Sequence, residues 1–376
     1  MINQGRTEDY LDSVDKAVSD WLSESNSEEK ERNLLEYRRS ALKKYTFIIA
    51  CIIIAVITAG YAVSIGEYKI SFSETYIRIW EHITGNITDT IADGVVWNMR
   101  LPRVIGGILA GSALAVCGVA MQSMLKNPLA DTYTTGISSG ASLGATLAMC
   151  AGITVFGGEY SLVVNAFLFS LVPMMLILAV SQMRNASVTT IIMAGIAVMY
   201  LFNACNTLLK LWATDEALAN VYSWSVGSLT GLSWSDITVM GVFVIPGIMI
   251  IQLMSRQLNK LTTGDECAKS LGVDVERFRL ACLLVTSLVA ASVVCFTGLI
   301  GFIGLVCPHM ARMFIGSDNR LLISASAASG AALLLVADVI GRIIIAPNTL
   351  QVGVVTAFIG APVFLFLVIK SKRTGW

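Results

Sequence analysis

The sequence predicts an all-α polytopic membrane protein with about ten transmembrane helices. Hydrophobic residues make up 55% of its 376 positions and charged residues only 14%, whereas roughly 25% of the residues of a soluble domain are charged. The mean hydropathy is +0.71. Apolar runs of about 20 residues, the length a helix needs to cross a bilayer, recur along the chain. The formal net charge of zero says little about partners, and we expect no nucleic-acid partner.

The predicted spans share this length and carry few charges. They cover residues 46–66, 102–124, 137–156, 161–181, 190–209, 236–255, 279–297, 299–315, 321–341 and 352–370. We therefore expect a ten-helix transmembrane domain over 46–376, preceded by a charged N-terminal extension over 1–45.

The extension is too long and too polar to be a signal peptide. Leu11, Val14, Val18 and Trp21 recur at helical spacing and predict a short amphipathic helix. Two readings stay open for this segment. It is either a solvated tail or a helix that lies on the membrane or on a cytoplasmic partner.

The second span has functional-looking ends. Arg100 and Arg103 stand at its start, residues 104–119 carry no charge, and Asn127-Pro128 breaks the chain just after its end. An anchoring helix needs neither feature, so both ends are candidates for a further role.

The distribution of basic residues predicts the topology. Ten spans place both termini on one side of the membrane. If that side is the cytoplasm, 20 of the 26 Lys and Arg residues face inward, as the positive-inside rule requires. The same topology places Arg100, Arg103 and Arg342 on the outer face, against the usual trend.

Glycines spaced four residues apart predict close helix packing. Gly107 and Gly111 form one such pair, and Gly136, Gly140 and Gly144 form a second run. Small residues at this spacing let helix backbones approach in lipid. We also expect irregular backbone at membrane depth over 127–139, which is tolerated only where it is buried in protein or lines a cavity.

Ionisable groups are scarce within the spans. Asp338 is the main exception. Ion-coupled transporters usually need intramembrane carboxylates or histidines as relays, so their scarcity argues against that class. His82 and His309 are far apart in the sequence, which argues against a histidine metal site, and the eight cysteines are interpreted as small apolar residues.

The sequence predicts a short helix within the longest cytoplasmic loop, residues 256–279. Gly264 and Gly272 bound this amphipathic segment, which is either a connector or a docking element. A phosphate-binding loop would need glycines where Thr263 and Ala268 stand, so we expect no nucleotide site in this chain.

Several motifs, in order along the chain, resemble the permease subunits of ATP-binding-cassette importers for iron–siderophore complexes, haem and cobalamin, the FecCD/BtuC-like family. The matching blocks are Arg100-Leu-Pro-Arg103, Gln122 through Asn127-Pro-Leu-Ala130, Gly136-Ile-Ser-Ser-Gly140-Ala, Gly264-Asp-Glu266 with Leu271-Gly272, Gly298 through Val306 with Pro308-His309, Ala337-Asp338, and Gly353-Val-Val-Thr356 with Gly360-Ala-Pro-Val-Phe364. The resemblance covers about residues 46–370; the long N-terminus departs from the family pattern.

The resemblance implies a multi-pass protein of the plasma or inner membrane, built like a type II importer permease. It implies a homodimer or a pseudo-symmetric pair of related subunits, with the translocation path at the dimer axis. It also implies two separate ATPase subunits on the cytoplasmic loop and an extracytoplasmic substrate-binding protein on the outer face. The ATPase would bind ATP and Mg²⁺. This chain would then hold no cofactor, no metal and no catalytic residue.

The resemblance also implies roles for three sets of residues. Arg100, Arg103 and Arg342 would dock the binding protein; the alternatives are snorkelling to lipid headgroups, or pairing of Arg342 with Asp338 four residues earlier. The residues that would couple the permease to the ATPase are Gly264, Asp265, Glu266, Ala268, Leu271 and Gly272. The residues that would form the cytoplasmic gate are Asn127, Leu129, Val188 and Thr189. The alternative is that these residues belong to simple turns between helices.

We therefore expect the permease subunit of an importer for an iron(III)–siderophore chelate. Cobalamin or haem as substrate is the alternative within the same class, and nothing in the residues chooses among them. An ion-coupled secondary transporter or a channel is the alternative from another class.

Overall fold

The computed structural model describes residue 32 and residues 42–133, 135–182 and 188–371. The chain divides into two compact units, Met1–Phe47 and Ile48–Trp376. The amphipathic helix expected around Leu11–Trp21 lies outside the described residues. Everything below concerns the second unit, apart from the first span, which begins at residue 42.

The described residues form helices and connecting turns, with no strand among them. Seven helices are long and apolar enough to cross a membrane: Leu42–Ser64, Thr90–Met124, Ser161–Val180, Thr189–Leu211, Trp234–Leu253, Val275–Thr297 and Asn319–Ile343. Three shorter apolar helices, Ile137–Ala151, Ile303–Ile315 and Val352–Leu367, fall on the remaining predicted spans. The predicted all-α fold with about ten membrane helices is confirmed.

Two of the short helices differ from their predicted lengths for a backbone reason. Helix α5 (Ile137–Ala151) ends at Gly152, whose φ of 65° is left-handed. Helix α12 (Val275–Thr297) ends at Gly298, with φ of 68°, and α13 (Ile303–Ile315) begins only after Phe302, also at 68°. Residues 298–302 are therefore non-helical and not the start of a span.

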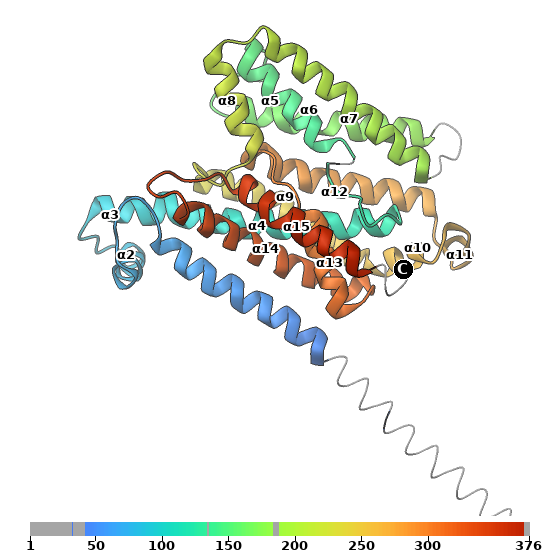
Figure 1. Cartoon of the computed structure of the whole chain (residues 1–376), viewed down its shortest axis with the longest axis horizontal. Coiled ribbons are helices and arrows are strands. Elements are labelled where there is room, and N and C mark those ends of the chain that lie inside the picture. Colours follow the sequence, from blue (N-terminus) through green and yellow to red (C-terminus); the bar gives the residue numbers. More distant parts are fainter. Residues whose placement is uncertain (1–31, 33–41, 134, 183–187, 372–376) are drawn as a thin grey trace, which may run out of the picture. The chain divides into compact units, whose positions relative to one another are not determined.

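Five short helices accompany the spans: one is the first turn of the Thr90–Met124 helix and four lie between spans, and only the last of the five was predicted. They are α2 (Phe72–Thr84), α3 (Thr90–Gly94), α8 (Asp215–Val226), α10 (Ser255–Thr262) and α11 (Asp265–Ser270). Ser71, Asp89 and Thr214 cap the first three, because each side chain accepts a hydrogen bond from a backbone N–H of the first turn. Figure 1 shows α2 and α3 at one end of the bundle and α10 and α11 at the other, here called the α2 end and the α11 end.

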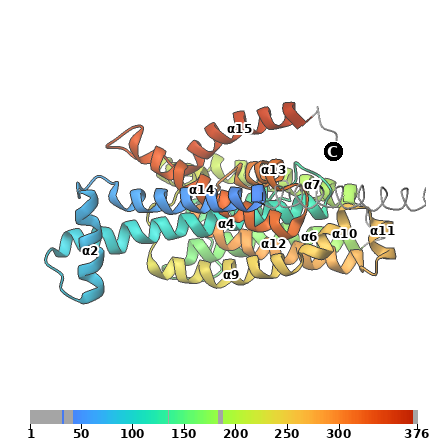
Figure 2. The same ribbon diagram turned by 90° about the horizontal axis from the view of Figure 1, so that it is seen from below.

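Helix α4 (Leu101–Met124), which continues from the π-helical turn η1 (Val95–Arg100), is the centre of the larger helix group (Figure 2). It packs against α9 (Trp234–Leu253), α12, α13 and α14 (Asn319–Ile343). A Cβ at Gly111 would lie 2.4 Å from the carbonyl oxygen of Gly330, and one at Gly118 would lie 2.0 Å from that of Gly304. Only glycine permits these backbone contacts, which confirms the packing role expected of Gly111.

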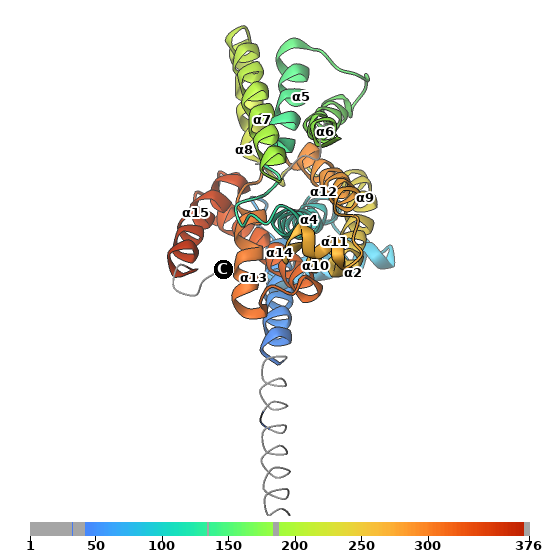
Figure 3. The ribbon, with the colours of Figure 1, turned by 90° about the vertical axis from the view of Figure 1, so that its right-hand side faces the viewer.

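A second group contains α5, α6 (Ser161–Gln182), α7 (Val188–Leu211) and α8 (Figure 3). Cβ atoms at Gly140 and Gly144 would each lie 2.4 Å from a carbonyl oxygen of α6, so these glycines also act in packing. Asn165 of α6 is buried and donates to the carbonyls of Gly144 (3.0 Å) and Ile153 (2.9 Å). Helix α12 packs against α6 on one side and α4 on the other, and so joins the groups.

Candidate functional site: an apolar cavity and two charged ends

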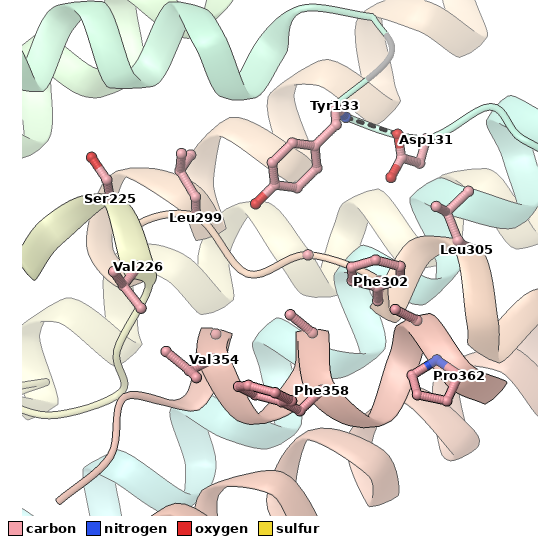
Figure 4. Close-up of a pocket in the computed structure, with 14 residues that line it drawn as sticks. Asp131, Tyr133, Ser225, Val226, Leu299, Phe302, Leu305, Val354, Phe358 and Pro362 are labelled. Atoms are coloured by element: carbon pink, nitrogen blue, oxygen red, sulfur yellow. Dashed lines mark hydrogen bonds between the residues drawn. The ribbon is translucent and has the colours of Figure 1, made fainter. Parts of the chain in front are cut away.

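A cavity of about 870 Å³ lies where α8, the 298–302 segment, α13 and α15 (Val352–Ser371) meet. Its lining comprises Asp131, Tyr133, Ser225, Val226, Leu299, Gly301, Phe302, Leu305, Gly353, Val354, Ala357, Phe358, Ala361 and Pro362. Figure 4 shows Tyr133 on one side and Val354, Phe358 and Pro362 of α15 on the opposite side. These residues come from four regions of the sequence, so no local pattern identified the cavity.

Three glycines allow the segments around the cavity to approach one another closely. Gly227 and Gly298 have φ of 78° and 68°, a conformation that favours glycine. A Cβ at Gly298 would lie 2.1 Å from the carbonyl oxygen of Trp224, and one at Gly353 would lie 1.7 Å from that of Val226. The glycines that begin two of the recognised motifs therefore bring backbone against backbone at the cavity wall.

The lining is predominantly apolar. Its polar side chains are those of Asp131, Tyr133 and Ser225, and the Asp131 carboxylate accepts a hydrogen bond from the backbone N–H of Tyr133 at 3.0 Å. Among the described residues, no group of three or more His, Cys, Asp and Glu could hold a metal ion. Such a surface can contact a bulky molecule by shape, but it offers no ligand set for a bare cation.

The α2 end contains a buried charge cluster, here called the arginine cluster, made of Arg100, Arg103, Arg342 and Asp338. Asp338 is 1% exposed. One of its oxygens accepts from Arg103 Nη2 at 2.7 Å, and the other accepts from Arg342 Nε at 2.9 Å. The structure thus brings together the three arginines predicted to dock a partner, and the Arg342–Asp338 pairing weighed as an alternative is present.

Backbone carbonyls in the last turn of the first span complete the arginine cluster. Arg100 Nη1 donates to the carbonyls of Val63 (3.1 Å) and Ser64 (3.0 Å), and Arg342 Nη1 donates to that of Ala62 (2.8 Å). Arg100 and Arg342 are only 5% and 6% exposed. Both guanidinium groups are therefore engaged inside the subunit and offer little surface to a partner. The Arg103 side chain, 12% exposed, is only slightly more accessible.

The α11 end contains the predicted gate turn. Helix α4 ends at Met124, and residues 125–136 are non-helical where described, as expected for most of 127–139. The Asn127 side chain accepts from the backbone N–H of Leu129 at 2.9 Å, and Leu129 is exposed. Thr189 is exposed at the start of α7, while the Val188 side chain lies outside the described residues.

The predicted coupling helix is α11, bounded by Gly264 and Gly272 with φ of 123° and 81°. Glu266 and Leu271 are exposed and available to a partner. Ala268 is fully buried against its own chain, so it belongs to the inner side of the helix and not, as expected, to the docking face.

The Asp265 side chain is partly exposed, but it also contacts basic residues of its own chain. Its carboxylate accepts from Lys126 Nζ at 2.6 Å and from Arg279 Nη2 at 3.1 Å. Burial opposes its ionisation, but the hydrogen bonds from Lys126 and Arg279 outweigh that effect and lower the pKa of Asp265. Because Lys126 immediately precedes Asn127, this carboxylate connects the predicted coupling helix to the predicted gate turn.

Sequence reasoning missed a polar network beside that connection. Gln122 of α4 donates to the Gly304 carbonyl at 3.2 Å and accepts from Arg312, and Ser123 donates to Asn319 at 2.8 Å. The available signal was the pair of polar residues in the last turn of an otherwise apolar span. Their partners lie nearly 200 positions away, so the pairing itself had no local signature.

Comparison with known proteins yields concordant matches. Residues 48–370 match the model of the FecCD transport family. The hemin transport system permease protein HmuU of Yersinia pestis is 37% identical over 325 residues, which cover 86% of this chain and 95% of the relative. The cobalamin import system permease protein BtuC of Halobacterium salinarum is 36% identical, over 73% of each chain. A solved metal-chelate type ABC transporter in an inward-facing conformation superposes with a TM-score of 0.76 at 28% identity, covering 86% of this chain and 99% of that one.

Proposed function

The chain belongs to the FecCD transport family, and from that premise we propose that it carries an iron(III)–siderophore chelate through the membrane into the cytoplasm. Members of this family are permease subunits of ATP-binding-cassette importers. The chain is accordingly a multi-pass membrane permease and not itself an enzyme, and a separate subunit hydrolyses ATP.

The observation that carries the substrate class is the apolar cavity. A ferric chelate, haem or cobalamin already satisfies its metal, so a path for it needs shape and weak polar contacts and no metal ligands. The cavity of about 870 Å³ is of a size typical for small-molecule sites, and Tyr133 and Ser225 supply its hydroxyl groups. A bare ion would need a charged or carbonyl-lined route instead.

We further propose that two copies of the chain assemble around this cavity, with both termini in the cytoplasm. The α2 end then faces outward and the α11 end faces the cytoplasm, in agreement with the basic-residue bias. A two-fold axis would place the same surface of each copy against the other, so one path would be lined twice by the same residues.

The exposed face of α11 is proposed to dock the ATPase. Glu266 and Leu271 offer a charged and an apolar contact on this face. Beside it lies a groove of about 420 Å³ lined by Gln257, Lys260, Gly272, Val273, Asp274, Arg277 and Phe278. Asp265 is then a positioning residue, because it joins the docked helix to Lys126 and so to the gate turn.

Docking of the binding protein at the α2 end remains a proposal. Arg103, with a side chain 12% exposed, is the most accessible of the three arginines, whereas Arg100 and Arg342 would act by holding the arginine cluster together. Replacing Arg103 with Glu should weaken the affinity for the binding protein. Adding salt should then weaken the affinity of this variant no further. An affinity unchanged by this substitution and by ionic strength would assign the arginines to the subunit interior alone.

Reconstitution tests the proposed function directly. The permease, its ATPase and its binding protein are placed in proteoliposomes, and ATP-dependent uptake of a radiolabelled ferric siderophore, cobalamin and haem is measured in parallel. We expect siderophore uptake that requires ATP. Uptake of haem or cobalamin alone would move the substrate to the one named for the Yersinia or Halobacterium relative. Uptake without ATPase that collapses with the proton gradient would favour a secondary transporter.

A further inference from the structure

Helix α2 carries an apolar stripe that the transport function leaves unexplained. Phe72, Tyr76, Trp80 and Ile83 recur at helical spacing and are 57%, 42%, 67% and 64% exposed. The exposed stripe occupies one side of the helix, because residues three and four positions apart lie on the same face. A water-facing helix outside the spans would normally carry polar residues in these positions.

The opposite side of α2 is charged and internally paired. Arg78 donates to Glu74 at 3.2 Å and to Glu81 at 2.8 Å. The helix therefore has a charged face, whose most exposed member is Glu74 at 41%, and an apolar face that has no cover within the described chain. This is the division expected of a helix at a membrane interface.

Caps and side-chain contacts hold α2 in place, so its exposed stripe has a defined position on the protein. Ser71 caps its start, and Gly85 ends it with φ of 76°. His82 lies 2.9 Å from the Asp93 carboxylate and stacks on Trp97 with ring centroids 3.9 Å apart. These contacts attach α2 to the base of the second span.

The orientation of α2 places the stripe beside the spans. Figure 1 shows α2 end-on while α4 runs across the view, and Figure 2 shows α2 lying across the direction of α4. The Tyr76 hydroxyl reaches Gly60, four positions before the end of the first span, where an added Cβ would lie 2.7 Å away. At Tyr76 the apolar face thus meets the first span, whose Ile57 and Tyr61, three positions before Gly60 and one after it, are also exposed.

We propose that α2 lies flat in the headgroup region of the bilayer at the α2 end, with Tyr76 and Trp80 as its interfacial anchors. Tyrosine and tryptophan favour this depth because each ring has an apolar body and a polar tip. The lipid surface fits as occupant because the stripe is continuous with an exposed apolar span. The helix would fix the height of the arginine cluster in the membrane, since Asp93 of α3 and Trp97 of η1 attach α2 to the segment that continues into α4.

Tryptophan fluorescence of the full-length protein in proteoliposomes tests this proposal without any transport assay. The Trp80 signal is the difference between the wild type and Trp80→Phe. We expect brominated phosphatidylcholine to quench most of that difference signal, and aqueous iodide to quench little of it. The matched control is the double variant Trp80→Phe/Glu74→Trp, whose new indole on the charged face should respond to iodide and not to brominated lipid.

Two outcomes would overturn the proposal. Quenching of the Trp80 signal by iodide alone would show that the stripe faces water. A Trp80 signal that is open to iodide in the isolated permease, and becomes protected only when the binding protein is added, would assign the stripe to that protein. Circular dichroism and gel filtration of both variants confirm that each is folded, so a change in quenching reports position.

Discussion

At the scale of single residues, Asp338 is the acid of the arginine cluster. It is fully buried and pairs with both Arg103 and Arg342. Replacing it with Asn keeps the shape but leaves two buried guanidinium groups short of a counter-charge. Breaking a buried ion pair by removing one partner costs about 3–5 kcal/mol.

We therefore predict that Asp338→Asn lowers the stability of the subunit by about that amount. Denaturant unfolding in detergent measures the change, and the exposed Asp215→Asn serves as a matched control with little expected effect. A stability equal to that of the wild type would mean that Arg103 and Arg342 find other acceptors when Asp338 is neutral.

Asp265 gives a second residue-scale prediction, concerning coupling. Asp265→Asn should leave ATPase binding intact but reduce the amount of substrate moved per ATP, because the link to Lys126 loses its charge. Glu266→Gln, one position along and exposed, should instead alter ATPase affinity. ATPase binding and uptake, measured together in proteoliposomes, separate the two effects; equal behaviour of the two variants would remove the linking role.

The pH dependence of this ion pair follows from the lowered pKa of Asp265. A carboxyl whose folded-state pKa is below its ordinary value of 3.8 contributes its full stabilisation above that value and loses it as pH falls through the folded pKa. The stability difference between the wild type and Asp265→Asn should therefore stay constant from neutral pH down to mildly acid pH. It should shrink only below the ordinary value, and an earlier decline in pH titrations would contradict the assigned direction.

At the scale of elements, helix packing depends on glycines at backbone contacts. Gly111→Ala would place a methyl group 2.4 Å from the Gly330 carbonyl oxygen, so α4 and α14 must separate. We predict a loss of about 1–3 kcal/mol, the usual cost of overpacking. Gly241→Ala in α9 is the matched control, since its Cβ meets side chains only at 3.9 Å. Thermal unfolding in detergent compares the two, and equal midpoints would refute the contact.

Helix α11, the proposed coupling helix, gives the second prediction at this scale. Leu271 is 51% exposed and needs no change in the fold to meet a partner. Leu271→Asp should weaken ATPase binding or disconnect ATP hydrolysis from uptake, because it puts a charge into an apolar contact. Thr262→Asp, an exposed change on α10, should do neither. Normal uptake and normal stimulated hydrolysis in Leu271→Asp would make α11 a simple connector.

At the scale of the whole molecule, the proposed gate belongs to a dimer. A bulky thiol cross-link between two copies carrying Asn127→Cys should stop uptake while leaving the assembly intact. Cys267→Ser provides the background, because Cys267 is exposed at the same end of the bundle. Cleaving a reducible cross-linker should restore uptake. Unimpaired uptake through the cross-linked dimer would place the gate elsewhere.

The span pattern and the packing glycines were readable from the sequence because both are local quantities. Hydropathy sums over a window of neighbouring residues, and helix faces repeat every three or four positions. The positions of the short helix α11 and of the non-helical turn after α4 followed in the same way. The interfacial helix α2 carried a local signal of the same kind at Phe72 and Trp80.

Pairings between distant residues were decided only by the tertiary structure. Arg103 and Asp338 are 235 positions apart, and Lys126 and Asp265 are 139 apart. Exposure could not be read from residue type either: Arg100 and Ala268 were predicted at surfaces and are buried. The identity of a single charged or apolar residue does not indicate its partner in the fold. Its burial and its hydrogen bonds depend on which helices the whole fold places beside it.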